Sequence, residues 1–138
     1  MTIPPSTRNG KFVESWYDAF NRGDIDTVLD GLAETVTWIE LDGHPLSGVH
    51  HGPDEVLVGV FWPLEEHFSR FEVRPEQFIE STTTVVVEGD ALVTSHAGTS
   101  VSIPFAHVCE LERGTCRVTR VTSYVDTALL RQAVDTNQ

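Results

Sequence analysis

The chain has 138 residues, which is the length of one folded domain. Apolar residues make up 40% and charged residues 22%, and this composition excludes a disordered chain. The net charge is −12 and the nine basic residues are scattered, which excludes nucleic acids and anionic membrane surfaces as partners. No apolar run approaches the roughly 20 residues that span a bilayer. The N-terminal region has no apolar signal segment, so we expect a cytoplasmic location.

The first half of the chain has the patterns of amphipathic helices. Residues 9–21 carry apolar side chains at spacings of three and four, and Gly23 is placed to end this helix. An N-capping aspartate then begins a second helix over 24–32. A third helix is expected over 52–64, where Pro63 would kink or divide it.

The rest of the chain is dominated by β-branched and aromatic residues, with turn residues between the runs. These runs predict strands over 36–41, 71–79, 83–88, 91–97, 103–112 and 116–126. Gly89 and Asp90 predict a hairpin turn, and a short helix is expected over 127–133. Because helices come first and strands follow, the fold class predicted is α+β, an antiparallel sheet packed on helices.

Five local strings resemble the nuclear transport factor 2-like superfamily, and in particular its SnoaL-like, ketosteroid isomerase-related branch. They are YDAFNRGD at 17–24, VTW at 36–38, GPDEV at 52–56, PFAHV at 104–108 and YVDTA at 124–128. The resemblance implies a cone-shaped curved antiparallel sheet wrapped around three helices, with an internal pocket for a small apolar ligand. It also implies one SnoaL-like domain over 1–138 with residues 1–7 frayed, and a homodimer packed through the sheets.

Three ionisable residues are candidates for catalysis. Glu40 aligns with the general base of ketosteroid isomerase, and His107 aligns with the protonated aspartate that donates to the enolate. Asp126 resembles the aspartate of limonene epoxide hydrolase and of many SnoaL-like sequences. Each has a structural alternative: Glu40 could face solvent, His107 could be a satisfied core residue, and Asp126 could cap the last helix.

Strand alternation extends this set to the side chains that would line the pocket. Trp38 shares a face with Glu40, and Tyr124 shares a face with Asp126. We therefore expect ligand contacts from Trp38 and Tyr124, and further contacts from Trp16, Phe61 and His96.

Two departures prevent either known mechanism from being transferred whole. The oxyanion-hole tyrosine of ketosteroid isomerase falls at Trp16, while Tyr17 is expected to face elsewhere on the helix. The arginine and second aspartate of the limonene family fall at His96 and Gly98, so no water-activating aspartate–arginine–aspartate system is expected.

No metal site is predicted, because the histidines have no ligand spacing and His50 and His51 are expected in a loop. No cofactor is expected either, since the chain has no glycine-rich phosphate loop. Cys109 and Cys116 are expected to be free thiols, although a bridge across the turn between them is conceivable.

The sequence favours a cofactor-independent enzyme that performs acid–base chemistry on an apolar metabolite, of the isomerase, cyclase or dehydratase type. The alternatives are a non-catalytic ligand-binding module and an assembly domain of the same fold. Several ionisable groups aimed at one pocket would favour the enzyme.

Overall fold

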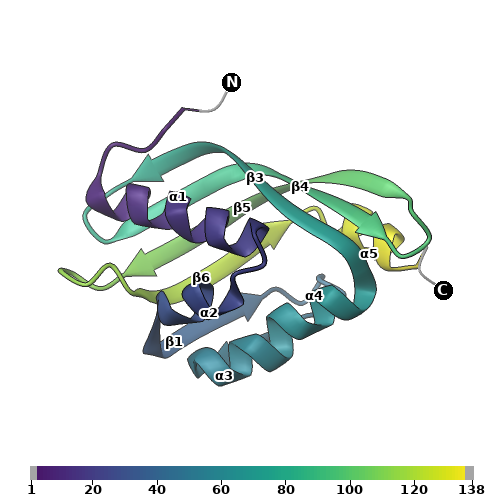
Figure 1. The fold of residues 1–138 in the computed structure, drawn as a ribbon, viewed down its shortest axis with the longest axis horizontal. Coiled ribbons are helices and arrows are strands. Elements are labelled where there is room, and N and C mark those ends of the chain that lie inside the picture. The colour runs from purple at the N-terminus through teal and green to yellow at the C-terminus, as the bar shows by residue number, and fades with distance from the viewer. Residues whose placement is uncertain (1–2, 136–138) are drawn as a thin grey trace.

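The computed structural model describes residues 3–135 (Figure 1). In chain order the elements are α1 (Arg8–Asn21), α2 (Ile25–Asp30), β1 (Leu32–Glu40), β2 (Gly48–His51), α3 (Gly52–Val56), the π-helical segment η1 (Leu57–Phe61), α4 (Trp62–His67), β3 (Phe68–Glu80), β4 (Thr84–Ser95), β5 (Ser100–Leu111), β6 (Val118–Val125) and α5 (Thr127–Asp135). None of the helices in this part of the chain is long and apolar enough to cross a membrane.

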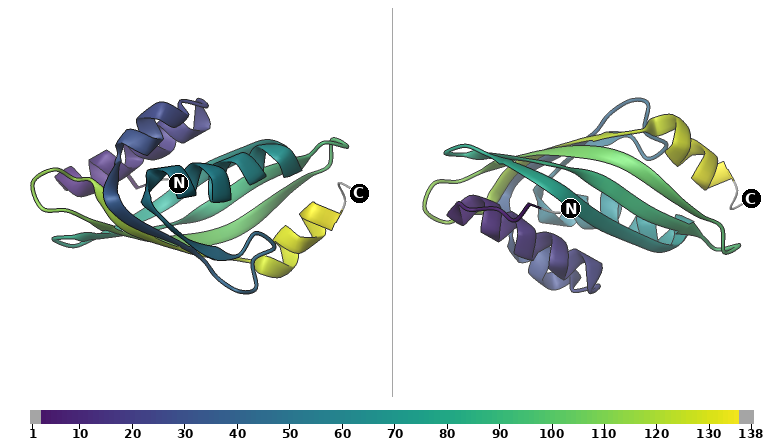
Figure 2. Two further views of the ribbon diagram at one scale, coloured as in Figure 1. Left: turned by 90° about the horizontal axis from the view of Figure 1, so that it is seen from below. Right: turned by 90° about the horizontal axis from the view of Figure 1, so that it is seen from above.

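The six strands form one curved sheet in the order β2-β1-β6-β5-β4-β3. Figure 2 shows α1, α2 and the continuous α3–α4 helix against one face of this sheet, with α5 at one end of the molecule. The predicted α+β cone is confirmed. The expectation of an all-antiparallel sheet is wrong at one pair, because β1 runs parallel to β6.

The first two helices begin at residues that cap them, and each packs its apolar side chains against the sheet. The Thr7 side chain accepts a hydrogen bond from the Gly10 amide and begins α1, which buries Val13, Trp16 and Tyr17. Asp24 accepts from the Thr27 amide at 3.2 Å, as its predicted role as N-cap requires.

The third helix runs without a break through α3, η1 and α4, and Pro63 lies in the first turn of α4, directly after the π-helical segment. The preceding turn is widened into the π-helix η1. Gly59 in η1 packs directly on an imidazole: a Cβ added there would lie 2.3 Å from Cε1 of His50. The absence of a side chain at Gly59 therefore allows the helix to approach β2.

Two local predictions are wrong. β4 continues through Gly89 and Asp90, and Gly89 lies opposite Pro75 on β3, where an added Cβ would be 2.2 Å from a backbone oxygen. The glycine thus serves a close strand contact instead of a turn. His50 and His51 lie on β2 and not in a loop, because this segment pairs with β1.

The N-terminal segment is held to the edge strand β3. The amide of Ile3 donates to the carbonyl of Glu76 at 3.2 Å, and the amides of Ser6 and Thr7 donate to the Glu80 carboxylate. Residues 1 and 2 lie outside the described part, and fraying of residues 1–7 stays a prediction. Cys109 and Cys116 are free and buried, as predicted.

Candidate functional site

A largely apolar pocket lies between the concave face of the sheet and the helices. The empty space within it is about 830 Å³, part of which is open to solvent. Most of its lining comes from aromatic and aliphatic side chains, including Trp16, Phe20, Trp38, Val60, Phe61, Leu64, Phe71, Ile103, Phe105, Val125 and Leu130. Five other lining residues carry acid–base or hydroxyl groups, namely Tyr17, Glu40, His44, His107 and Ser123.

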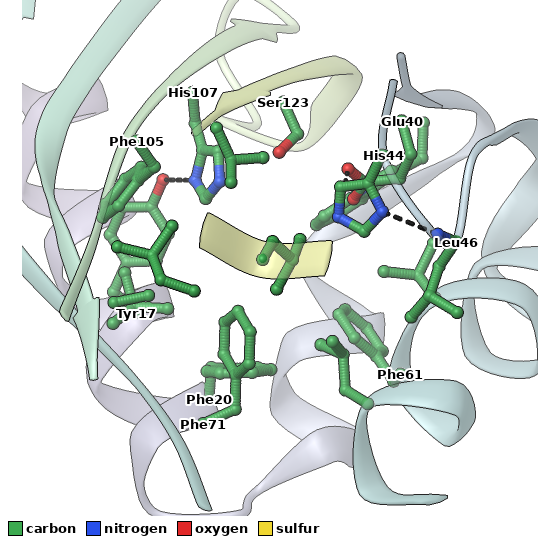
Figure 3. Close-up of a pocket in the computed structure, with 18 of the residues that line it drawn as sticks. Tyr17, Phe20, Glu40, His44, Leu46, Phe61, Phe71, Phe105, His107 and Ser123 are labelled. Carbon is green, nitrogen blue, oxygen red and sulfur yellow. Dashed lines mark hydrogen bonds and ion pairs between the residues drawn. The ribbon is translucent and has the colours of Figure 1, made fainter. Parts of the chain in front are cut away.

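The sheet register places three of these groups in one row. Glu40 on β1 pairs with Ser123 on β6, and Ser123 pairs with His107 on β5. Neighbouring strands are about 4.8 Å apart, so the backbones of Glu40 and His107 are about 10 Å apart. Figure 3 shows the three side chains along one side of the pocket, with Ser123 between the other two. A small molecule can therefore contact both ends of the row at once.

Glu40 is buried at one end of the row, with 8% of its surface exposed. Its Oε1 accepts a hydrogen bond from the Trp38 indole N–H at 2.9 Å, whereas its Oε2 is buried without a hydrogen bond. Burial raises the pKa of this carboxyl to about 7, although Trp38 and Ser123 oppose the shift by stabilising the charged form. Glu40 can therefore take or give a proton near neutral pH.

His44 lies beside this carboxylate, in the loop between β1 and β2. The Leu46 amide donates to its Nδ1 at 2.9 Å, so the neutral ring carries its proton on Nε2. That nitrogen lies 3.4 Å from Oε2 of Glu40. Burial, assisted by the positive charge of Arg131, lowers the pKa of His44 to about 4, which keeps the ring neutral. Arg131 on α5 also holds the loop by donating to the Gly43 carbonyl at 2.9 Å.

Tyr17 and His107 form a second polar group at the other end of the row. The Tyr17 hydroxyl and His107 Nδ1 are 2.7 Å apart, and the His107 ring packs on Phe105 with centroids 4.3 Å apart (Figure 3). Burial, with a smaller effect of His44, lowers the pKa of His107 to about 4. Burial, with a contribution from Cys109, raises the pKa of Tyr17. Both groups are therefore neutral hydrogen-bonding partners at physiological pH.

Five of the predicted site residues line this pocket, namely Trp16, Trp38, Glu40, Phe61 and His107. Trp38 and Glu40 share the inner face of β1, as alternation predicted. Three predicted residues do not line it. Tyr124 is 49% exposed on the other face of β6, and His96 is exposed beyond β4 with its Nε2 2.9 Å from the Glu66 carbonyl. The predicted ligand contacts of Tyr124 and His96 are therefore wrong.

Asp126, the third, is exposed and caps α5, so its predicted position in the pocket is wrong. Its Oδ1 accepts from the Leu129 amide at 3.1 Å, which is the geometry of an N-cap.

We expect Asp126→Ala to lower the free energy of unfolding by about 1 kcal/mol, as loss of such a cap does. Urea denaturation measures this change, and ligand affinity should be unaffected. An unchanged stability with lost ligand affinity would contradict the capping role.

Sequence analysis missed Tyr17, His44 and Ser123. Ser123 was missed because β6 was assigned the opposite face, although Val121 and Val125 at even spacing on either side marked its face as apolar. Tyr17 was missed because α1 packs into the cone with a stripe wide enough to bury both Trp16 and Tyr17. His44 lies in a loop, where periodicity gives no signal.

The raised pKa of Glu40 predicts a stability difference that needs no substrate. The pKa of this carboxyl is about 4.5 in the unfolded chain and about 7 in the folded protein. Between these pH values the folded state holds a proton that the unfolded state has released. The free energy of unfolding therefore falls as the pH rises from about 4.5 to about 7. Glu40→Gln removes this loss. We expect the variant to be more stable than the wild type by up to about 3 kcal/mol at pH 8, and nearly equal at pH 4.5.

Urea denaturation of both proteins at the two pH values measures the difference. The histidines that face Glu40 and its row, His44 and His107, gain charge at low pH in both proteins, so their contribution cancels. A variant less stable than the wild type at pH 8 would show that Glu40 is held as a stabilising ion.

Relatives of this structure are found by sequence and by fold. The sequence profile of the SnoaL-like domain matches residues 13–121, most of the chain. The chain belongs to the SnoaL-like family. No curated protein sequence matches this SnoaL-like chain.

Solved structures share its fold across nearly its whole length. An NTF2-like protein of unknown function from Burkholderia pseudomallei is 33% identical, with 94% of this chain and 98% of that chain covered and a TM-score of 0.85. TerC, crystallised with polyporic acid, is 25% identical, with 94% and 99% covered and a TM-score of 0.85. A proposed SnoaL-like polyketide cyclase from Shewanella putrefaciens is 12% identical, with 96% and 99% covered and a TM-score of 0.80, and shows the fold alone.

Proposed function

We propose that this SnoaL-like protein is a cofactor-independent enzyme that moves a proton on an uncharged, apolar metabolite with a carbonyl group. The observation that carries the proposal is the position of Glu40, a buried carboxyl with a pKa of about 7 at one end of an apolar pocket whose other end holds Tyr17 and His107. A general base is most effective when its pKa lies near the working pH. An apolar binding module has no need of such a group.

In the proposed reaction the Glu40 carboxylate removes a proton from the carbon next to the substrate carbonyl. The electron pair of the broken C–H bond moves onto the carbonyl oxygen and gives an enolate. The Tyr17 hydroxyl donates to Nδ1 of His107, and the ring then presents its Nε2–H to this oxygen. The proton returns from Glu40 to another carbon in an isomerisation. In a cyclisation the enolate carbon attacks a second carbonyl, which takes up the proton.

The lining of the pocket supports an uncharged substrate. No lysine or arginine is among the lining residues of the described chain, and Tyr17, His44 and His107 are neutral at pH 7 for the reasons given above. An anionic group would therefore lose its hydration without gaining a positive partner. TerC, a structural neighbour that is 25% identical, was crystallised with polyporic acid, which supports a small organic molecule as the ligand.

The test uses a two-ring ketone that has acidic hydrogens and no charge, 2-tetralone. We expect the protein to accelerate exchange of its α-hydrogens for deuterium in D₂O, which proton NMR follows directly. Exchange at the buffer rate, with the ketone shown to bind by quenching of tryptophan fluorescence, would favour the non-catalytic binding module.

We further propose that two copies of the chain pair through the outer face of the sheet. An unbroken row of mostly apolar residues crosses all six strands on that face, namely Val49, Ile39, Thr122, Val108, Val86 and Ile79. The ends of this row, Val49 and Ile79, are 54% and 47% exposed. Exposed contiguous apolar surface of this kind is typical of an interface.

The dimer proposal predicts that Val108→Lys converts the protein to a monomer while the fold is retained. A lysine at the centre of two paired sheets would face its own copy and leave two buried charges unpaired. Sedimentation equilibrium measures the mass of both proteins. A wild-type monomer at micromolar concentration would overturn the proposal. The cytoplasmic location remains a prediction.

A further inference from the structure

A second groove lies on the outside of the pocket, between the α1–α2 turn, α4 and the start of β3. Its lining includes Ile25, Phe68 and Arg70, which do not line the pocket. Four other residues, Phe20, Phe61, Leu64 and Phe71, line both cavities. We call these four the partition, since the pocket and the groove lie on its two sides.

The side chains of the partition line both cavities, and two of its rings, those of Phe61 and Phe71, pack on the third, that of Phe20. Phe20 packs against Phe61 with centroids 5.8 Å apart and against Phe71 at 6.3 Å. Figure 3 places these three rings on the side of the pocket away from His107. Phe20, Leu64 and Phe71 are only partly buried, which leaves them fewer packing neighbours to hold their rotamers than a core residue has. The partition is thus a partly exposed wall between the two cavities, opposite the polar row.

The chemistry of the groove indicates what could occupy it. Its apolar lining comes from the partition together with Ile25 and Phe68, and its polar lining comes from Asn21, Glu65, Ser69, Arg70 and Glu72. Its one cation among the lining residues, Arg70, already pairs with Glu72. An anionic group would have no free positive partner there and would meet the carboxylates of Glu65 and Glu72, whereas a hydrocarbon chain would gain apolar contact with the partition, Ile25 and Phe68.

We infer that the groove is a second subsite, which takes the uncharged hydrocarbon tail of an elongated ligand whose head lies between Glu40 and His107. The tail passes through the partition beside Phe20 and Leu64. The position of the head rests on the proposed function. The inference therefore extends the substrate class to a carbonyl-bearing ring with an apolar chain.

The experiment uses 4-alkylphenols with ethyl, butyl, hexyl and octyl chains, whose neutral ring and hydroxyl stand in for the head. Trp16 and Trp38 line the pocket, so quenching of their fluorescence reports binding. Each methylene buried in the groove should tighten binding by roughly fourfold. Ile25→Glu places a charge on the groove floor at the first residue of α2, where an acidic side chain suits the helix dipole.

We expect Ile25→Glu to weaken binding of octylphenol at least tenfold and that of ethylphenol less than twofold. The ethylphenol result also reports that the fold is intact. Val58→Glu is the matched control, since Val58 is 55% exposed and lines neither cavity, and it should leave both affinities unchanged. Equal affinity for octylphenol in both variants would overturn the inference.

The outcome is independent of the proton chemistry. If 2-tetralone does not exchange its hydrogens but Ile25→Glu still discriminates by chain length, the subsite stands and the enzyme proposal fails. If exchange is rapid and the affinity for phenols stops rising beyond the ethyl chain, the enzyme proposal stands and the second subsite fails.

Discussion

Glu40→Gln is expected to slow deuterium exchange of 2-tetralone by a factor of about 10² to 10⁴, the usual contribution of a positioned general base. Glutamine keeps the shape of the side chain and can still accept the hydrogen bond from Trp38, which in the wild type is 2.9 Å long. It has no basic oxygen that could hold the substrate proton. The loss should therefore appear in kcat, with little change in KM.

The pH dependence of the wild type provides a second readout of the same residue. The carboxylate is the active form, so the exchange rate should rise with pH, reach half its maximum near pH 7 and level off above it. Asp126→Ala is the matched control, because Asp126 lies outside the pocket, and it should leave the rate and its pH profile unchanged. A Glu40→Gln variant with wild-type exchange would remove Glu40 from the mechanism.

His107→Leu is expected to lower kcat by about 10² to 10³, as loss of one donor to a developing oxyanion does. The effect should fall on kcat more than on KM, because the enolate oxygen bears more charge than the carbonyl of the bound ketone. Steady-state exchange rates at several ketone concentrations separate the two constants. If His107→Leu instead raised KM and left kcat unchanged, His107 would only shape the pocket.

Tyr17→Phe tests whether the tyrosine acts through His107. The change removes the Tyr17 hydroxyl, which lies 2.7 Å from Nδ1 of His107, and keeps the aromatic ring of residue 17. We expect a decrease in kcat of about tenfold, the value of one hydrogen bond. Because His107 has a pKa of about 4, the rate of the wild type should show no second titration near pH 6.5. Such a titration would mean that His107 gains a proton in the pocket.

The sequence predicted the helical layer and part of the site because these features depend on local patterns. Apolar spacing located α1, and alternation placed Trp38 and Glu40 together on the inner face of β1. The position of His107 also followed from alternation, since Phe105 and Cys109 on either side mark an apolar face. Each of these inferences required only the neighbouring residues in the chain.

The remaining features depend on pairing between distant segments. The register of β6 decides whether Ser123 or Tyr124 faces the pocket, and a shift in the pairing of β5 with β6 lies between Glu110 and Leu111. Tyr124 and Asp126 were expected inside because of the resemblance at 124–128, although the alternation of Val121 and Val125 marks the face of Ser123 as the apolar one. His44 reaches Glu40 from a loop that Arg131, far along the chain, contacts through the Gly43 carbonyl.

The most direct test of the account is the titration of the Glu40 carboxyl itself. Carbon-13 NMR of protein labelled at the glutamate carboxyl carbons, with Glu40→Gln to assign the resonance, measures its pKa in the folded protein. We expect a midpoint near pH 7, raised by burial in the pocket. A midpoint near the ordinary value of 4.5 would show an ion already stable in the pocket and would contradict the proposed role of Glu40 as general base.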